Sequence, residues 1–188
     1  MTSIRHELIL GGAKSGKSRT AEDRAAAWLR ADHDHRATLV ATALPGDEEM
    51  ATRIDRHRKD RADRLPALET VEAAAALGAT LRRLADPQRL LVVDCLTLWL
   101  TQILMPPEGN ASAGLWHQER TELLSALRES ASPVVLVSNE IGLGVMPMSR
   151  EAREFIDALG LLHQAVAGLC SRVTWMVAGC ELTVKDAR

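Results

Sequence analysis

The sequence has 188 residues, 46% of them apolar, which suits one domain of ordinary size spanning residues 1–188. No run approaches the ~20 apolar residues that span a bilayer, and the N-terminal MTSIRHE lacks a secretory pattern, so we expect a soluble, cytoplasmic protein with no membrane span. A net charge of -2, no tyrosine and one phenylalanine argue against nucleic acid as a partner.

Short apolar runs alternate with longer helical patterns along the chain. The runs predict β-strands at Glu7 to Leu10, Ala37 to Thr42, Leu90 to Asp94, Val134 to Ser138 and Val173 to Ala178. This alternation is typical of an α/β fold with a mostly parallel central sheet flanked by helices. The segments LLVVD and VVLVS are apolar at nearly every position, as expected for central strands. A loop is expected from Met105 to Gly114.

The first predicted strand runs into a P-loop pattern, G-x-x-x-x-G-K-[ST], and a helical stretch follows it. The glycines let backbone N–H groups and the start of the helix point at phosphate oxygens. Lys17 can reach the outer phosphates and Ser18 can bind Mg2+. We therefore predict nucleoside triphosphate binding, against the alternative of a glycine-rich turn alone. The predicted binding residues are Gly11, Gly12, Ala13, Lys14, Ser15, Gly16, Lys17 and Ser18.

Asp94 ends the apolar run LLVVD, where P-loop proteins carry the acidic residue that holds magnesium. We predict that Asp94 binds Mg2+ together with Ser18. The alternative is that Asp94 acts only as a strand-end or helix N-cap residue before Cys95.

A basic stripe is expected on a helix that begins near the acidic residues Asp47 to Glu49. Its members Arg53, His57, Arg61 and Arg64 follow at intervals of three or four residues and so share one face. Cations beside His57 favour its neutral form, which could attack a polyphosphate held by the arginines. From spacing alone, a solvated charged face is the more common explanation of such a stripe.

Segments along the chain resemble, in the same order, those of the bifunctional adenosylcobinamide kinase / adenosylcobinamide-phosphate guanylyltransferases of cobalamin biosynthesis. The resemblance covers nearly the whole chain and is carried by LILGGAKSGKS, VATALPGDEEMATRIDRHRKDR, ETVEA, LLVVDCLTLWLTQIL, VVLVSNEIGLGVMP and REFIDALGLLHQAVA.

This resemblance implies two reactions on one P-loop NTPase-like domain: phosphorylation of adenosylcobinamide with ATP or GTP, then transfer of GMP from GTP. It makes His57 the residue that carries GMP and Lys17 a catalytic cation. It also implies a corrinoid substrate and a homo-oligomer, with a trimer suggested. The further nucleotide contacts that it implies are Ala41, Thr42, Ala43, Arg58, Lys59, Asp60, Arg61 and Asp94.

Three positions need interpretation against the family pattern. The T-x-E glutamate falls on Glu72, although Glu69 would fit with a different placement of the extra residues before it. His163 stands where the family has asparagine, and is interpreted as a polar packing residue. Asn139 and Glu140 follow a predicted strand, which suits either ligand binding or turn formation.

Two rival functions are a small-metabolite kinase with γ-phosphoryl transfer only and a non-catalytic nucleotide switch. A guanine-nucleotide switch normally carries an N-K-x-D segment, which SNEIG does not match. A plain kinase would have no need of His57. Trp99 and Trp116 are predicted to pack in the core or an interface rather than to bind a ligand.

Overall fold

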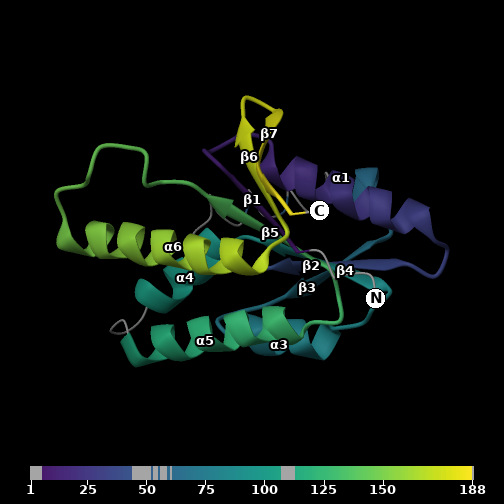
Figure 1. Ribbon diagram of the computed structural model, residues 1–188, viewed down its shortest axis with the longest axis horizontal. Coiled ribbons are helices and arrows are strands. Elements are labelled where there is room, and N and C mark those ends of the chain that lie inside the picture. Colours follow the sequence, from purple (N-terminus) through teal and green to yellow (C-terminus); the bar gives the residue numbers. More distant parts are fainter. Residues whose placement is uncertain are drawn as a thin grey trace.

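The computed structural model describes residues 6–43, 52, 55, 59, 61–106 and 113–187. These residues form a sheet of seven strands with helices on both faces (Figure 1). The strand order is β3-β2-β4-β5-β1-β6-β7; neighbours are parallel except β7, which is antiparallel to β6. The predicted α/β class with a mostly parallel sheet is confirmed.

The elements follow one another in the alternating order expected of such a fold. Their bounds are β1 Glu7–Gly11, α1 Lys17–Ala31, β2 Arg36–Ala41, β3 Leu68–Glu72, α3 Leu77–Leu84, β4 Arg89–Asp94, α4 Leu96–Leu104, α5 Ala113–Glu129, β5 Val134–Asn139, α6 Arg150–Leu169, β6 Arg172–Val177 and β7 Cys180–Asp186. Residues 52, 55, 59 and 61–64 are also helical, within the stretch where a helix was predicted.

The central strands present alternate side chains to two apolar layers. In β1, Leu8 and Leu10 pack toward α3, α4, α5 and α6, whereas Ile9 packs toward α1. Figure 1 shows α1 on one side of the sheet and α3, α4, α5 and α6 on the opposite side. Because both faces are covered, the central strands are apolar at nearly every position. Trp99, fully buried in the larger layer, is a core residue as predicted.

Two strands were missed by the sequence reading, and both lie at the edges of the sheet. β3 and β7 each have a neighbour on one side only, and most of their side chains are exposed. Edge strands need no continuous apolar run, so the pattern that identified the central strands is absent there. Ala113 and Gly114, predicted to be loop, belong to α5; residues 107–112 of that loop lie outside the described residues.

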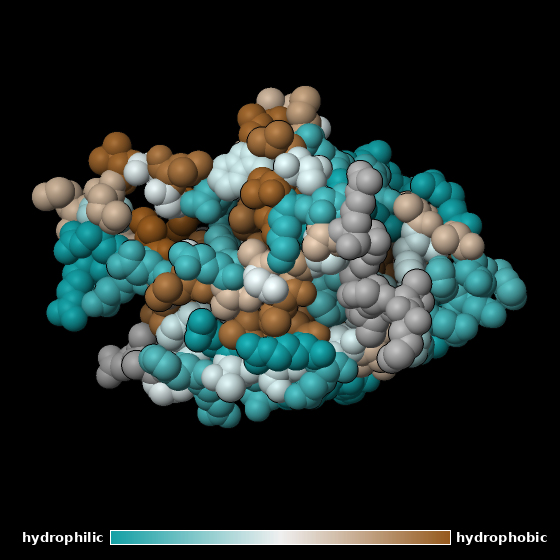
Figure 2. Space-filling model, viewed as in Figure 1, coloured by the Kyte–Doolittle hydropathy of each residue, from teal (hydrophilic) through white to brown (hydrophobic). Residues whose placement is uncertain are grey.

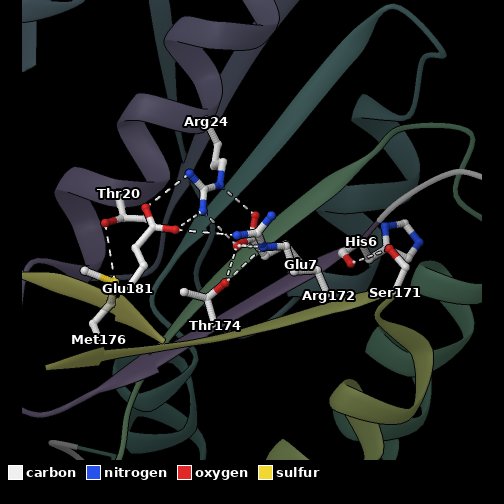
Figure 3. Close-up of polar contacts among 9 residues, drawn as sticks. All are labelled: His6, Glu7, Thr20, Arg24, Ser171, Arg172, Thr174, Met176 and Glu181. Carbon is white, nitrogen blue, oxygen red and sulfur yellow. Dashed lines mark hydrogen bonds and ion pairs between the residues drawn. The ribbon is translucent and has the colours of Figure 1, made fainter. Parts of the chain in front are cut away.

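An ion network joins α1 to the strands at one end of the sheet (Figure 3). Glu7 is 7% exposed and accepts hydrogen bonds from Arg24 Nε at 2.9 Å and from Thr174 Oγ1 at 2.6 Å. Arg172 Nε lies 3.3 Å from the same carboxylate. Arg24 Nη2 also donates to Glu181 Oε2 of β7 at 2.5 Å. The network therefore links β7, through α1 and β1, to the body of the sheet.

We expect Glu7→Gln to lower the free energy of unfolding by about 1–3 kcal/mol, because it removes the charge that both arginines face in a largely buried position. Urea denaturation measures this loss. The control is Glu154→Gln, which breaks an exposed pair with Arg150 on α6 and should leave stability unchanged. Equal losses in the two variants would contradict a special role for the network.

Candidate active site

The P-loop lies between β5 and β6 at the carboxyl edge of the sheet. The backbone N–H of Glu140, just after β5, donates to the carbonyl oxygen of Gly11 at 3.0 Å. On the other side, Gly179 in the β6–β7 turn donates to the carbonyl oxygen of Ser15 at 3.0 Å. The loop is thus fixed to a neighbour on each side, at the edge where α/β sheets bind ligands.

Two glycines of the loop are required by its path. A Cβ at Gly11 would lie 2.5 Å from the carbonyl oxygen of Met176, a backbone atom of β6 that cannot easily move. Gly16 has φ of 102° and directly precedes α1, a conformation that other residues rarely adopt. These glycines bring the start of α1 to the carboxyl edge, with its first N–H groups available to an anion.

Lys17 is buried, with 7% of its surface exposed, in the first turn of α1. Its Nζ donates to the carbonyl oxygen of Gly12 at 2.6 Å and lies 3.5 Å from Ser15 Oγ. The ammonium group is therefore held over the loop in which the phosphates are expected. Ser18, the next residue of the helix, is half-buried.

The predicted residues Ala41, Glu72 and Asp94 form one row across three strands. Ala41 of β2 is in register with Glu72 of β3 on one side and with Asp94 of β4 on the other. Glu69 pairs with Thr38, in the interior of the strands, so Glu72 is the glutamate that reaches the carboxyl edge. The residue that caps α4 is Cys95, which removes the capping role considered for Asp94.

Thr42 and Ala43 directly follow β2. Thr42 is fully buried, and its hydroxyl donates to the carbonyl oxygen of Cys95 at 2.7 Å and accepts from Cys95 N–H at 2.8 Å. Its carbonyl oxygen accepts a hydrogen bond from Gln102. The Thr42 side chain thus holds the turn after Asp94 in place. Nucleotide contacts by Thr42 and by the half-buried Ala43 stay predictions.

Glu22 is a buried residue of α1 that the sequence reading missed. Burial raises the pKa of its carboxyl group, opposed by Arg64 and Arg61, and Asp94 nearby raises it further. Arg64 Nη2 lies 2.7 Å from Glu22 Oε2. The position of Glu22 one turn after Ser18 was the available signal, because residues four apart share a helix face.

The Glu22–Arg64 pair brings the end of the predicted basic stripe next to the P-loop helix. Arg61 is half-buried, and Lys59 is exposed. The proposed nucleophile His57, its stripe neighbour Arg53, and Arg58 and Asp60 lie outside the described residues.

Cys95, beside Asp94, has little chemical reactivity in this environment. Burial, with the neighbouring Asp94 carboxylate adding to it, raises the pKa of its thiol to about 12. A thiol that stays protonated at neutral pH is a poor nucleophile. Cys95 therefore acts through packing and its backbone bonds to Thr42.

A buried polar chain lies beside the P-loop under Glu140. His163 of α6 has Nε2 at 2.8 Å from Ser138 Oγ and Nδ1 at 3.7 Å from Glu140 Oε2. Ser138 Oγ lies 3.0 Å from Thr97 Oγ1, which accepts from the backbone N–H of Asn139 at 2.9 Å. Burial lowers the pKa of His163, against the opposing effect of Glu140. His163 is thus the buried, hydrogen-bonded residue that was predicted.

Comparison with known protein families identifies the chain. Residues 7–184 match the family described as CobU: Cobinamide kinase / cobinamide phosphate guanyltransferase. The chain belongs to this family.

Relatives from three bacteria match along almost their whole length. The bifunctional adenosylcobalamin biosynthesis protein CobP of Pseudomonas aeruginosa is 46% identical over 180 residues, covering 95% of this chain and 96% of the relative. The proteins CobU of Escherichia coli and Salmonella typhimurium are 32% and 31% identical, each over 95% of this chain and 98% of the relative.

Family membership assigns two activities to this chain, as the sequence predicted. It is a cobinamide kinase and a cobinamide-phosphate guanylyltransferase of adenosylcobalamin biosynthesis. Nucleotides and cobinamide are therefore its substrates. No helix within the described part of the chain is long and apolar enough to cross a membrane.

Two buried histidines of the chain predict that its stability depends on pH. The pKa values of His6 and His163 are lowered from 6.5 chiefly by burial, so the unfolded chain binds more protons than the folded one as these groups titrate. Stability should be fully present above about pH 6.5 and fall as the pH drops toward the folded-state pKa values.

We expect His163→Asn to flatten this decline, since its amide can still bond Ser138 but does not titrate. Urea denaturation at pH 5 to 8 measures the slope. His33→Asn is the control, because the His33 side chain is 91% exposed. An unchanged slope in His163→Asn would contradict the assignment.

Proposed function

We propose that both reactions use one nucleotide site, formed by the P-loop and the row Ala41, Glu72 and Asp94, and that GMP is carried by His57. The observation that supports this proposal most strongly is the P-loop itself, which joins a buried lysine, a helix start and the carboxyl ends of the strands. The phosphates of ATP or GTP bind at the start of α1, because its N–H groups and Lys17 attract anions.

Ser18 and Asp94 would hold Mg2+ in this proposal. A hydroxyl and a carboxylate supply the oxygen ligands that Mg2+ prefers. The carboxylates of Asp94 and Glu22 lie close enough to interact, since Asp94 contributes to the raised pKa of Glu22. A divalent cation suits such a concentration of carboxylates, and when bound it neutralises charge on the phosphate oxygens.

The guanylyl transfer proceeds in two displacements. A ring nitrogen of His57 attacks the α-phosphorus of GTP, the bond to the bridging oxygen breaks, and pyrophosphate leaves. A phosphate oxygen of cobinamide phosphate then attacks the same phosphorus, and the P–N bond breaks to give the cobinamide-GDP product. Arg61 and Arg64 at the end of the basic helix support this assignment, because the Glu22–Arg64 contact joins that helix to the P-loop helix.

A homo-oligomer, with a trimer as the suggested state, is also part of the proposal. The segment after β5 exposes large apolar side chains: Leu143 is 80% exposed, Val145 98% and Met148 94%. Figure 2 shows apolar side chains on the projecting loop that leads to α6. Such a group of apolar side chains is typical of a subunit contact.

Labelling with GTP carrying a radioactive α-phosphate tests the His57 intermediate. Wild-type protein incubated with Mg2+ and this GTP should retain label after denaturation, and the label should be acid-labile and base-stable, as a P–N bond is. His57→Ala should retain none.

The same variant separates the proposal from a plain kinase. His57→Ala should still phosphorylate cobinamide, since γ-phosphoryl transfer does not use the histidine. Absence of label from wild type would leave a kinase without the histidine intermediate, and label of equal amount in the variant would place the GMP on another residue.

A further inference from the structure

A backbone hydrogen bond holds Glu140 beside the P-loop. It follows the last residue of β5, and its N–H donates to Gly11, the first residue of the P-loop, at 3.0 Å. The nucleotide residues Ala41, Glu72 and Asp94 lie on β2, β3 and β4, whereas Glu140 and α6 flank the loop from β5. Glu140 therefore stands beside the phosphate site and outside the row assigned to the nucleotide.

The carboxylate of Glu140 is oriented from two sides and remains accessible. Its Oε1 accepts a hydrogen bond from the N–H of Gly142 at 2.5 Å, and its Oε2 lies 3.7 Å from His163 Nδ1. The Glu140 side chain is 20% exposed. Behind it, Ser138 and Thr97 fix the His163 ring through its other nitrogen. A buried polar chain thus orients a carboxylate that a ligand can still reach.

A pocket of about 500 Å³ opens at this carboxylate. Its walls are largely apolar, with Ile141, Met146, Ile156 and Leu161 among the lining residues, and Gln164 and Asp157 add polar groups. Apolar walls with a few polar groups are typical of small-molecule sites. Cobinamide offers matching chemistry, because its corrin edge is apolar and its side arms carry amides and the hydroxyl. The volume suits one such arm.

We propose that this pocket holds the hydroxyl-bearing arm of cobinamide and that Glu140 is the catalytic carboxylate that takes up the hydroxyl proton during phosphoryl transfer. The proposal rests on the kinase reaction at the P-loop described above. His163 is a positioning residue, since it acts through Glu140.

The step balances with the substrates of the kinase. The cobinamide hydroxyl oxygen forms a bond to the γ-phosphorus of ATP or GTP, the bond from that phosphorus to the bridging oxygen breaks, and the nucleoside diphosphate leaves. The hydroxyl proton passes to a carboxylate oxygen of Glu140 and is later released to water. Guanylyl transfer has no such demand, because the attacking phosphate monoester is largely ionised at neutral pH.

Glu140→Gln tests the carboxylate, because the amide oxygen can still accept from Gly142. Its kcat for cobinamide phosphorylation should fall roughly 10²–10⁴-fold, the usual contribution of general base catalysis. Its KM for the nucleotide and its guanylyl transfer to purified cobinamide phosphate should stay within about twofold of wild type. Glu151→Gln, at an exposed position in the first turn of α6, is the control and should keep both activities.

Selective loss of the kinase reaction supports the proposal. An unchanged kinase kcat, or equal loss of both reactions, would overturn it. If wild type itself phosphorylates no cobinamide, the proposed kinase function fails together with this inference, whereas an active wild type with an equally active Glu140→Gln rejects the inference alone.

Gly160→Leu tests the pocket without disturbing the fold. Gly160 lines the pocket, and a Cβ there would meet no atom within 4 Å. Gly168, also on α6 with nothing within 4 Å of its Cβ, lies outside the pocket lining and gives the matched control Gly168→Leu. Both changes favour the helix, since glycine is a weak helix former.

The KM for cobinamide should rise at least about 10-fold in Gly160→Leu, because the added side chain occupies pocket space that the substrate arm needs, with the nucleotide KM unchanged. Gly168→Leu should behave as wild type. Light scattering on the same samples gives the oligomeric mass. An unchanged cobinamide KM would overturn the proposal. A change of mass alongside that unchanged KM would make the pocket a subunit contact.

Discussion

The close approach of Gly11 to Met176 is the constraint on which the site depends. Gly11 is paired with Asn139 of β5 on one side and with Met176 of β6 on the other, and a side chain at Gly11 would collide with the β6 backbone. Because Gly11 has no side chain, β1 stays paired with both neighbouring strands up to Gly11, and the P-loop begins there. This places the start of α1 against the carboxyl ends of the neighbouring strands.

The charged groups around this turn are held by a hydrogen bond and an ion pair. Lys17 is directed toward the loop by the Gly12 carbonyl, and the Glu22–Arg64 pair lies one turn further along α1. Buried ionised groups need such partners because transfer from water is costly. The site therefore holds its cations and carboxylates in fixed positions, which suits reactions in which negative charge moves between phosphate groups.

The carboxyl edge of the sheet carries two groups of residues on the β5 side of the P-loop. Strands β2, β3 and β4 supply a row of residues suited to the nucleotide, and the end of β5 with α6 supplies a pocket with an oriented carboxylate. A single phosphate-binding loop next to β5 can serve two transfers that share a nucleotide but differ in the attacking group. This arrangement gives a physical account of a bifunctional enzyme in one small domain.

The sequence by itself determined the central strands, the P-loop and the family, because buried parallel strands and phosphate loops impose local patterns of apolar residues and glycines. It could not identify the edge strands β3 and β7, whose pairing on one side leaves no continuous apolar signal.

Only the tertiary structure decided which residues meet across the sheet. The register of β2 and β3 places Glu72, rather than Glu69, at the carboxyl edge, and the start of α4 makes Cys95, rather than Asp94, its N-cap. Contacts between distant segments also form the Glu22–Arg64 pair. They form the hydrogen-bonded chain that runs from Thr97 through Ser138 and His163 to Glu140. Such contacts arise when helices pack on the sheet, so local spacing in the sequence does not show which partners meet.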